Sequence, residues 1–146
     1  MHSNNTINHL YQEINLEKRE IDLIVCYVLK INTARLLIYD NEISKKQHEK
    51  IIELCRKRID GMPYAYITGE KSFWSLDLKV NKHTLIPRPE TEMLVELVLE
   101  KTSPDFQGNV LDLGTGTGAI ALSIALERPN AQISAIDFSK ECTKVA

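Results

Sequence analysis

The chain has 146 residues, enough for one domain or two small ones, and its 43% hydrophobic and 26% charged residues are typical of a folded globular protein. The net charge of −2 excludes a broad positive field for holding nucleic acid. No apolar run is long enough to span a bilayer, and the first residues lack the pattern of a signal or transit peptide.

The three cysteines and four histidines are widely spaced. They form no Cys-x-x-Cys pair and no histidine motif with metal-ligand spacing. We therefore expect no disulfide framework and no metal site, and a reducing, cytoplasmic location fits this cysteine usage.

The first sixty residues predict a small helical bundle. Helices are expected at residues 7–14, 18–30, 33–39 and 45–58. In the second of these, Ile21, Ile24 and Val25 fall on one face. Ser44 and Gln47 form a capping-box pattern before the fourth helix, which is expected to stop at 61–63.

The pattern changes after Pro63, where residues 70–74 and 76–80 predict two strands of a β-hairpin that joins the two halves of the chain. Phe73 and Trp74 have two interpretations. They fill a junction or stack on a base, and we prefer the first because large aromatic residues usually supply buried contact area.

Residues 85–92 contain Pro-Arg-Pro-Glu-Thr-Glu and predict the start of another helix. Pro89 is tolerated in a first helical turn, and Glu90 and Glu92 suit the helix dipole. Arg88 has no such local explanation and is expected to bind a ligand or lie at a junction. The helix should end before Ser103. Its expected buried face consists of Met93, Leu94, Leu97 and Val98.

The most informative stretch begins with an apolar run at 110–113, which predicts a buried strand. A glycine-rich turn follows at 114–118, and 119–126 predicts a buried helix. A second strand is expected at 132–136, and it ends in Asp137. Strand, glycine turn, helix, strand and acid in this order predict a nucleotide-binding βαβ unit, in which the acid hydrogen-bonds ribose hydroxyls.

Asp112 helps to decide which nucleotide is bound. A carboxylate two residues before Gly114 would repel the pyrophosphate of a dinucleotide. It would suit S-adenosylmethionine, which carries an ammonium and a sulfonium group. Two alternatives stay open: a dinucleotide oxidoreductase, and a turn that only packs a helix on a sheet.

Several of these stretches together are similar to the HemK/PrmC family, the release-factor glutamine N5-methyltransferases. The resemblance covers nearly the whole chain, from about Leu23 onward. The stretches that carry it are 61–69, Phe73-Trp74, 85–92, 111–118 and 136–139.

The resemblance implies an α/β fold class: an N-terminal helical bundle at 1–61, a β-hairpin connector at 62–84, and at 85–146 the first βαβ portion of a Rossmann-like methyltransferase domain. It implies S-adenosylmethionine as methyl donor and the Gly-Gly-Gln loop of peptide-chain release factors as substrate. The helical domain would help to dock the release factor, and we expect a monomer. The residues implied to bind the donor are Gly114, Thr115, Gly116, Thr117, Gly118 and, at the ribose, Asp137.

The chain departs from the family in one respect. Members carry an Asn-Pro-Pro-Tyr motif that holds the substrate amide, and this sequence contains no Pro-Pro pair. We assign no catalytic residue in it and expect it to correspond to the N-terminal part of such an enzyme. By itself it should be catalytically silent and marginally folded beyond Leu85, and robust methyl transfer would contradict this.

Two further alternatives come from different functional classes. The chain could act as a non-catalytic module that binds a release factor or another partner through its helices. It could also belong to a methyltransferase of adenine N6, because such enzymes use the same Asn-Pro-Pro-Tyr chemistry on a flipped base. The acidic balance disfavours direct nucleic-acid binding.

Overall fold

The computed structural model describes residues 5–40 and 42–146 and divides the chain into two compact units. One unit, here called the helical unit, ends at Thr68. The other, the α/β unit, runs from Gly69 to Ala146. Within the described ranges, no helix is both long enough and apolar enough to cross a membrane.

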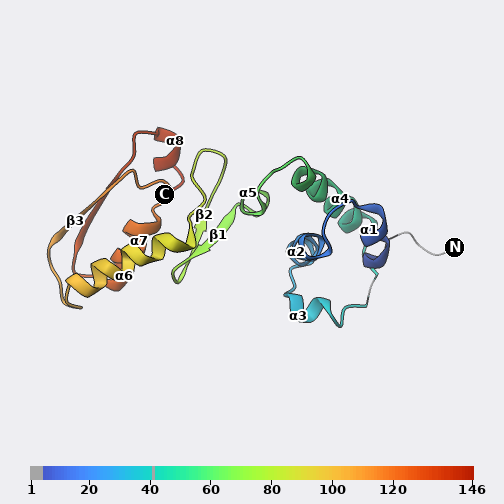
Figure 1. Ribbon diagram of the computed structural model, residues 1–146, viewed down its shortest axis with the longest axis horizontal. Helices are drawn as coiled ribbons and strands as arrows, with labels where there is room; N and C mark the ends of the chain where they lie inside the picture. Colours follow the sequence, from blue (N-terminus) through green and yellow to red (C-terminus); the bar gives the residue numbers. More distant parts are fainter. Residues whose placement is uncertain (1–4, 41) are drawn as a thin grey trace. The chain divides into compact units, whose positions relative to one another are not determined.

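The helical unit is a small bundle around one apolar core (Figure 1). Its helices are α1 (Ile7–Glu13), α2 (Lys18–Leu29), α3 (Thr33–Leu36), α4 (Lys45–Ile59) and α5 (Tyr64–Thr68). Ile21, Ile24 and Val25 of α2 are buried, which confirms the predicted face, and they pack with Leu10 and Ile51. A core of this kind lets the unit bury its apolar surface without help from the α/β unit.

Polar caps define where these helices begin. The Ser44 hydroxyl accepts a hydrogen bond from the Gln47 N–H, and the Gln47 side chain binds back to the Ser44 N–H, which confirms the predicted capping box. Helix α5 was not predicted. It is held to α2 by the Tyr64 hydroxyl, which donates to the Leu23 carbonyl at 3.1 Å.

Cys55 is buried in this core, and burial raises the pKa of its thiol to about 11, with a smaller contribution from Glu20. A raised pKa favours the protonated native state, so this contribution to stability is complete below about pH 8.5 and is lost as pH rises toward 11. At pH 8 we expect iodoacetamide to label Cys55 only after unfolding, as read by mass spectrometry with and without urea. Native labelling as fast as that of a free thiol would contradict this burial.

The α/β unit begins with an antiparallel hairpin of β1 (Glu70–Phe73) and β2 (Leu76–Lys79). Phe73 pairs with Leu76, so only Trp74 and Ser75 form the turn. The prediction that Trp74 ends the strand was wrong. Its φ of 55° lies in the left-handed region, which a two-residue hairpin turn usually fills with glycine.

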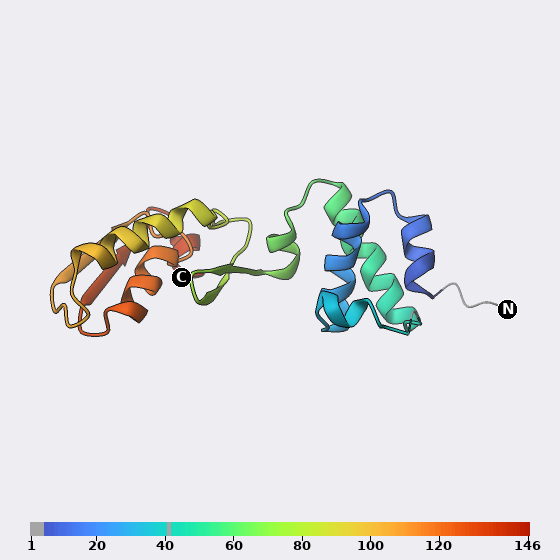
Figure 2. The ribbon, with the colours of Figure 1, turned by 60° about the horizontal axis from the view of Figure 1, so that its bottom comes forward.

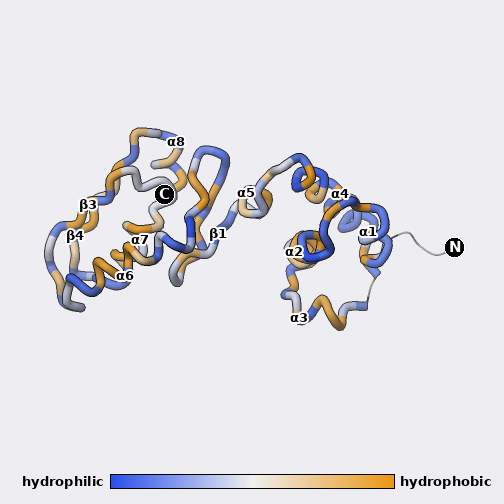
Figure 3. Tube along the Cα trace, viewed as in Figure 1, coloured by the Kyte–Doolittle hydropathy of each residue, from blue (hydrophilic) through white to orange (hydrophobic). Residues whose placement is uncertain are grey.

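The rest of the unit is a two-stranded parallel sheet with helices. Its elements are η1 (Pro89–Thr91), α6 (Glu92–Lys101), β3 (Asn109–Leu113), α7 (Ala119–Glu127), β4 (Gln132–Ile136) and α8 (Lys140–Thr143). Strand β3 pairs with β4 in register Leu111↔Ser134, and α6 and α7 lie side by side over the sheet (Figure 2). Hydrophobic residues predominate along β3 and α7 (Figure 3). The predicted strand, turn, helix and strand order is confirmed.

Two burial predictions for this unit were wrong. In α6 the buried residue is Val95, whereas Met93 is 61% exposed and Leu94 and Leu97 are about half exposed. The reason is that α6 is apolar on two faces: Val95 packs in a buried cluster with Ala119 of α7, whereas Leu94 and Leu97 line an open groove. The apolar periodicity of a helix cannot tell which of two such faces finds a partner.

Strand β3 is not buried on both faces either. In the described part of the chain it pairs with β4 alone, so its other edge is free. Leu111 is 57% and Leu113 69% exposed, since α7 covers the opposite face of the sheet. This open face agrees with the expectation of an unpaired edge and exposed apolar residues beside the glycine turn.

Arg128 ties the ends of α6 and α7 together and was not singled out by the sequence. It is only 8% exposed. Its guanidinium donates to the carbonyls of Leu99 and Thr102, both at 2.9 Å, to the Thr102 hydroxyl at 3.0 Å and to the Glu127 carbonyl at 2.8 Å. The Leu99 and Thr102 carbonyls lie at the C-terminal end of α6, where backbone carbonyls have no hydrogen-bond partner within the helix.

Candidate functional site

The glycine-rich turn between β3 and α7 adopts a backbone that favours glycine. Gly114, Gly116 and Gly118 have φ values of 78°, 57° and 78°, in the left-handed region where other residues are strained. A Cβ added at Gly114 or Gly116 would meet no heavy atom within 4 Å. The outer side of the turn is therefore open to an approaching ligand.

Gly118 differs from the other two. It precedes the first residue of α7, and an added Cβ would lie 3.0 Å from Leu122 Cδ1. A side chain here would have to displace Leu122 within the same helix. Gly118 thus allows the close packing of the turn on α7.

Asp137 holds the turn in place from the end of β4. Its carboxylate accepts hydrogen bonds from the N–H groups of Gly116 and Ser139, both at 2.8 Å. The bond from Ser139, followed by that from Gly116, lowers the pKa of Asp137 below its ordinary value, so the group is ionised at neutral pH. Each carboxylate oxygen retains capacity for a further hydrogen bond.

Asp112 makes a second contact within the turn. Its Oδ2 accepts a hydrogen bond from the Thr115 hydroxyl at 2.8 Å. Thr115 and Thr117 are both buried within the turn. The turn is therefore ordered by contacts from both strands before any ligand is present.

A cavity of about 200 Å³ lies beside the turn and is here called the loop pocket. It brings together two segments that are distant in sequence, 85–91 and 112–120. The lining residues are Leu85, Pro87, Arg88, Thr91, Asp112, Gly114, Thr115, Gly116, Thr117, Ala119 and Ile120. Four of the six predicted binding residues line this pocket, whereas Gly118 and Asp137 do not.

The loop pocket carries one charge of each sign. Arg88, which the sequence left between two roles, is an exposed cation at its rim, and Asp112 is a partly buried anion. A guanidinium pairs well with a carboxylate, and a carboxylate attracts a cationic group. The pocket therefore suits a ligand that carries both charges better than a pyrophosphate.

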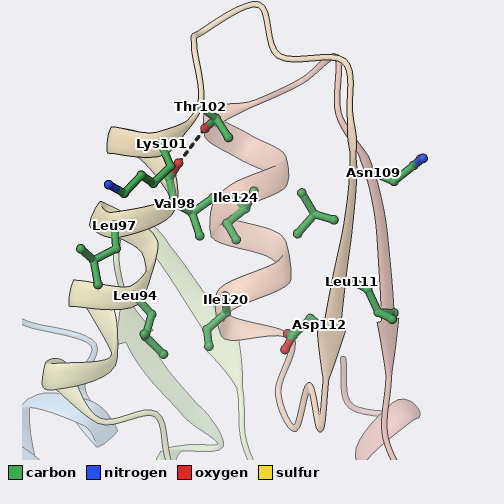
Figure 4. A pocket seen from close by; sticks show the side chains of 11 residues that line it. Leu94, Leu97, Val98, Lys101, Thr102, Asn109, Leu111, Asp112, Ile120 and Ile124 are labelled. Atoms are coloured by element: carbon green, nitrogen blue, oxygen red, sulfur yellow. Dashed lines mark hydrogen bonds between the residues drawn. The ribbon is translucent and has the colours of Figure 1, made fainter.

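A larger apolar groove of about 640 Å³ lies between α6, α7 and β3 (Figure 4). Leu94 and Leu97 reach it from α6, and Ile120 and Ile124 reach it from α7. Asp112 lines both this groove and the loop pocket. The groove therefore opens next to the candidate site.

Exposed apolar surface of this size should bind a hydrophobic dye. We expect Leu97→Gln to reduce the fluorescence of 8-anilinonaphthalene-1-sulfonate bound to the native chain, with a stability change within about 0.5 kcal/mol, as for most exposed positions. Leu37→Gln is the matched control, because Leu37 is exposed in the helical unit. Equal dye binding by the Leu97 variant and the wild type would contradict an open groove.

Comparison with known proteins agrees with this geometry. Residues 5–69 match the family described as PrmC N-terminal domain, and residues 89–146 match the methyltransferase small domain. The chain is 47% identical over 125 residues to the release factor glutamine methyltransferase of Vibrio cholerae, a match that covers 85% of this chain and 43% of that protein. The chain therefore combines a segment similar to the PrmC N-terminal domain with a segment similar to the methyltransferase small domain.

Two further relatives match over a similar part of the chain. The release factor glutamine methyltransferase of Coxiella burnetii is 44% identical over 128 residues, covering 87% of this chain and 46% of its own. The release factor glutamine methyltransferase of Escherichia coli is 39% identical over 130 residues, a match that covers 88% of this chain and 47% of that protein. The chain thus spans about half the length of the curated relatives it matches.

The two matches give each unit a counterpart. The PrmC N-terminal domain match spans the helical unit, and the methyltransferase match contains the glycine turn, Asp137 and all of α6. Among the described residues, no three histidine, cysteine or acidic side chains are grouped so that they could hold a metal ion.

Proposed function

We propose that this chain binds S-adenosylmethionine at the glycine turn and serves the methylation of a glutamine side chain in peptide-chain release factors. The observation that carries the proposal is the loop pocket, where the open face of Gly114–Thr117 meets the segment that contains Arg88 and Thr91. The fold around it is the strand, turn and helix of a nucleotide-binding unit.

The residues present fit this donor. Asp112 supplies the negative charge that an ammonium or sulfonium group requires, and Arg88 supplies a partner for the methionine carboxylate. Asp137 lies at the end of β4, the position at which an acid meets ribose hydroxyls, and its carboxylate can accept further hydrogen bonds. The donor, when bound, supplies an activated methyl group.

The chain's own part in the reaction is positioning. The glycine turn and Asp137 would hold the donor in one orientation, and catalysis would come from the proximity of the methyl group to an amide nitrogen. We propose that the helical unit, at 1–61 in the predicted division, docks the release factor, and that residues 62–84 connect it to the methyltransferase part. The reaction belongs to the cytoplasm, where release factors act.

The test is donor binding by the 146-residue chain, measured by isothermal titration calorimetry with S-adenosylmethionine, S-adenosylhomocysteine and NAD. We expect both adenosyl ligands to bind and NAD to bind more weakly. Tighter binding of NAD would indicate a dinucleotide site, and no binding of either adenosyl ligand would refute the proposal.

Methyl transfer is tested separately with tritiated donor and purified release factor, with the Escherichia coli relative as positive control and duplex DNA as alternative substrate. For this chain alone we expect donor binding without transfer to either substrate. Transfer to DNA by the chain would instead support the adenine-N6 alternative.

A second candidate function is partner binding without methyl transfer. The observation that favours it is the independent core of the helical unit, which buries Leu10, Ile24 and Ile51 by itself. Binding of a release factor by a chain that fails to bind the donor would support this candidate over the first.

A further inference from the structure

Phe73 at the end of β1 and Trp74 in the hairpin turn contact both helices that border the loop pocket. Phe73 is 1% exposed and lies in one buried cluster with Val95 of α6 and Ala119 of α7. Ala119 also lines the loop pocket. Because protein interiors are close-packed, the buried Phe73 side chain helps to set the distance between α6 and α7.

Trp74 adds two hydrogen bonds to this contact. Its backbone N–H donates to Glu92 Oε1 at 2.8 Å, and its indole Nε1 donates to Glu127 Oε1 at 2.8 Å. Glu92 is the first residue of α6, and Glu127 is the last residue of α7. One residue therefore joins both helices through carboxylates that lie 18 and 53 positions away.

The backbone of Trp74 is an outlier, because a bulky residue rarely adopts a φ of 55°. Such a conformation persists only where the surroundings impose it, and it is associated with functional sites. Here the Glu92 carboxylate binds the N–H of the strained residue itself.

The direct neighbour of Glu92 is Thr91, which lines the loop pocket together with Arg88. On the other side of the pocket, Ala119 and Ile120 begin α7. The two walls of the pocket are thus the starts of the same two helices that the hairpin turn joins.

We propose that Glu92 is a positioning residue for the donor site: through Trp74 it fixes the segment 88–91 against the glycine turn and so sets the width of the loop pocket. This rests on the proposed donor binding. Glu92 does not line the pocket, and it acts through Thr91 and Arg88.

The test compares Glu92→Ala with Glu92→Gln and with the matched control Glu96→Ala, which removes the same charge from an exposed position of α6 outside the segment 88–91. Affinity for S-adenosylmethionine is measured by calorimetry at a temperature where circular dichroism shows each variant fully folded. We expect Glu92→Ala to weaken binding about tenfold, the equivalent of one hydrogen bond to a charged group. Glu92→Gln retains an acceptor for the Trp74 N–H and should restore most of the affinity, and Glu96→Ala should bind as the wild type does.

Trp74→Phe keeps the backbone bond to Glu92 and removes only the bond to Glu127. It provides a second variant if Glu92→Ala does not fold, and a severalfold loss of affinity is expected. Equal affinity of the wild type, Glu92→Ala and Trp74→Phe, with a lower melting temperature for the variants, would show a merely stabilising contact and overturn the inference. Failure of the wild type to bind the donor would instead refute the proposed site, and the inference would fall with it.

Discussion

Replacement of Asp137 by alanine is expected to weaken S-adenosylmethionine binding about a hundredfold, the effect of losing two charged hydrogen bonds. The variant would lack the acceptor that holds the Gly116 N–H at 2.8 Å and, in the proposed site, the acceptor for the ribose hydroxyls. Calorimetric titration of the folded variant measures the effect. Asp105→Ala is the control, because it removes an exposed carboxylate from a distant loop of the same unit.

The two roles of Asp137 are separable with a donor analogue that lacks the ribose hydroxyls. If Asp137 binds the ribose, this analogue should bind the wild type and Asp137→Ala with similar, low affinity, since the interaction is already absent. If Asp137 only orders the turn, the analogue should lose as much affinity from the substitution as the donor does. Unchanged donor affinity in Asp137→Ala would refute both roles.

The affinity for S-adenosylmethionine should fall only at acidic pH, where Asp137 becomes protonated. The pKa of Asp137 is lowered by the N–H groups of Ser139 and Gly116, so the carboxylate remains ionised throughout the neutral range. Its contributions to stability and binding are present above the ordinary aspartate pKa of about 3.9 and are lost as pH falls through the lowered value. Between pH 8 and 5 we therefore expect no titration of the site by this residue.

Replacement of Arg128 by methionine is expected to lower the free energy of unfolding of the α/β unit by about 3 kcal/mol, because buried carbonyl groups lose their donors. Arg128 is 8% exposed, and its guanidinium donates to the Leu99 and Thr102 carbonyls at the end of α6. Methionine preserves most of the side-chain volume, so the change reports mainly on hydrogen bonding.

Urea unfolding followed by tryptophan fluorescence measures this effect, since Trp74 is the single tryptophan of the chain and lies in the α/β unit. Lys82→Met is the control, as it removes an exposed positive charge from the same unit. A stability loss below about 0.5 kcal/mol, the range of ordinary surface substitutions, would show that water replaces the guanidinium at little cost.

The local features of this protein were predictable because their causes lie within a few residues. The capping box of Ser44 and Gln47 depends on groups three positions apart, and the left-handed φ angles at 114, 116 and 118 favour glycine in the turn itself. The parallel pairing of β3 and β4 follows from one helix between two strands. The short stretches that resemble the PrmC family are likewise continuous in the sequence, so they could be recognised without the structure.

Features that depend on distant partners were missed or misjudged. The apolar pattern of α6 could not show that Val95 rather than Leu94 meets α7, since that depends on where α7 lies. No local pattern marks Arg128 as buried, because its acceptors at Leu99 and Thr102 lie in another helix. Arginine is mostly exposed in proteins, so its type alone predicted the opposite.

The sequence by itself determined the class of the fold, the resemblance to the PrmC family and the position of the glycine turn, because helix periodicity, capping and glycine conformation are set by neighbouring residues. Only the tertiary structure decided that Arg88 and Thr91 meet the glycine turn in one pocket, and that Trp74 joins Glu92 to Glu127. Those contacts form when the chain packs its helices on the sheet, and their energy depends on distances between segments that no local pattern encodes.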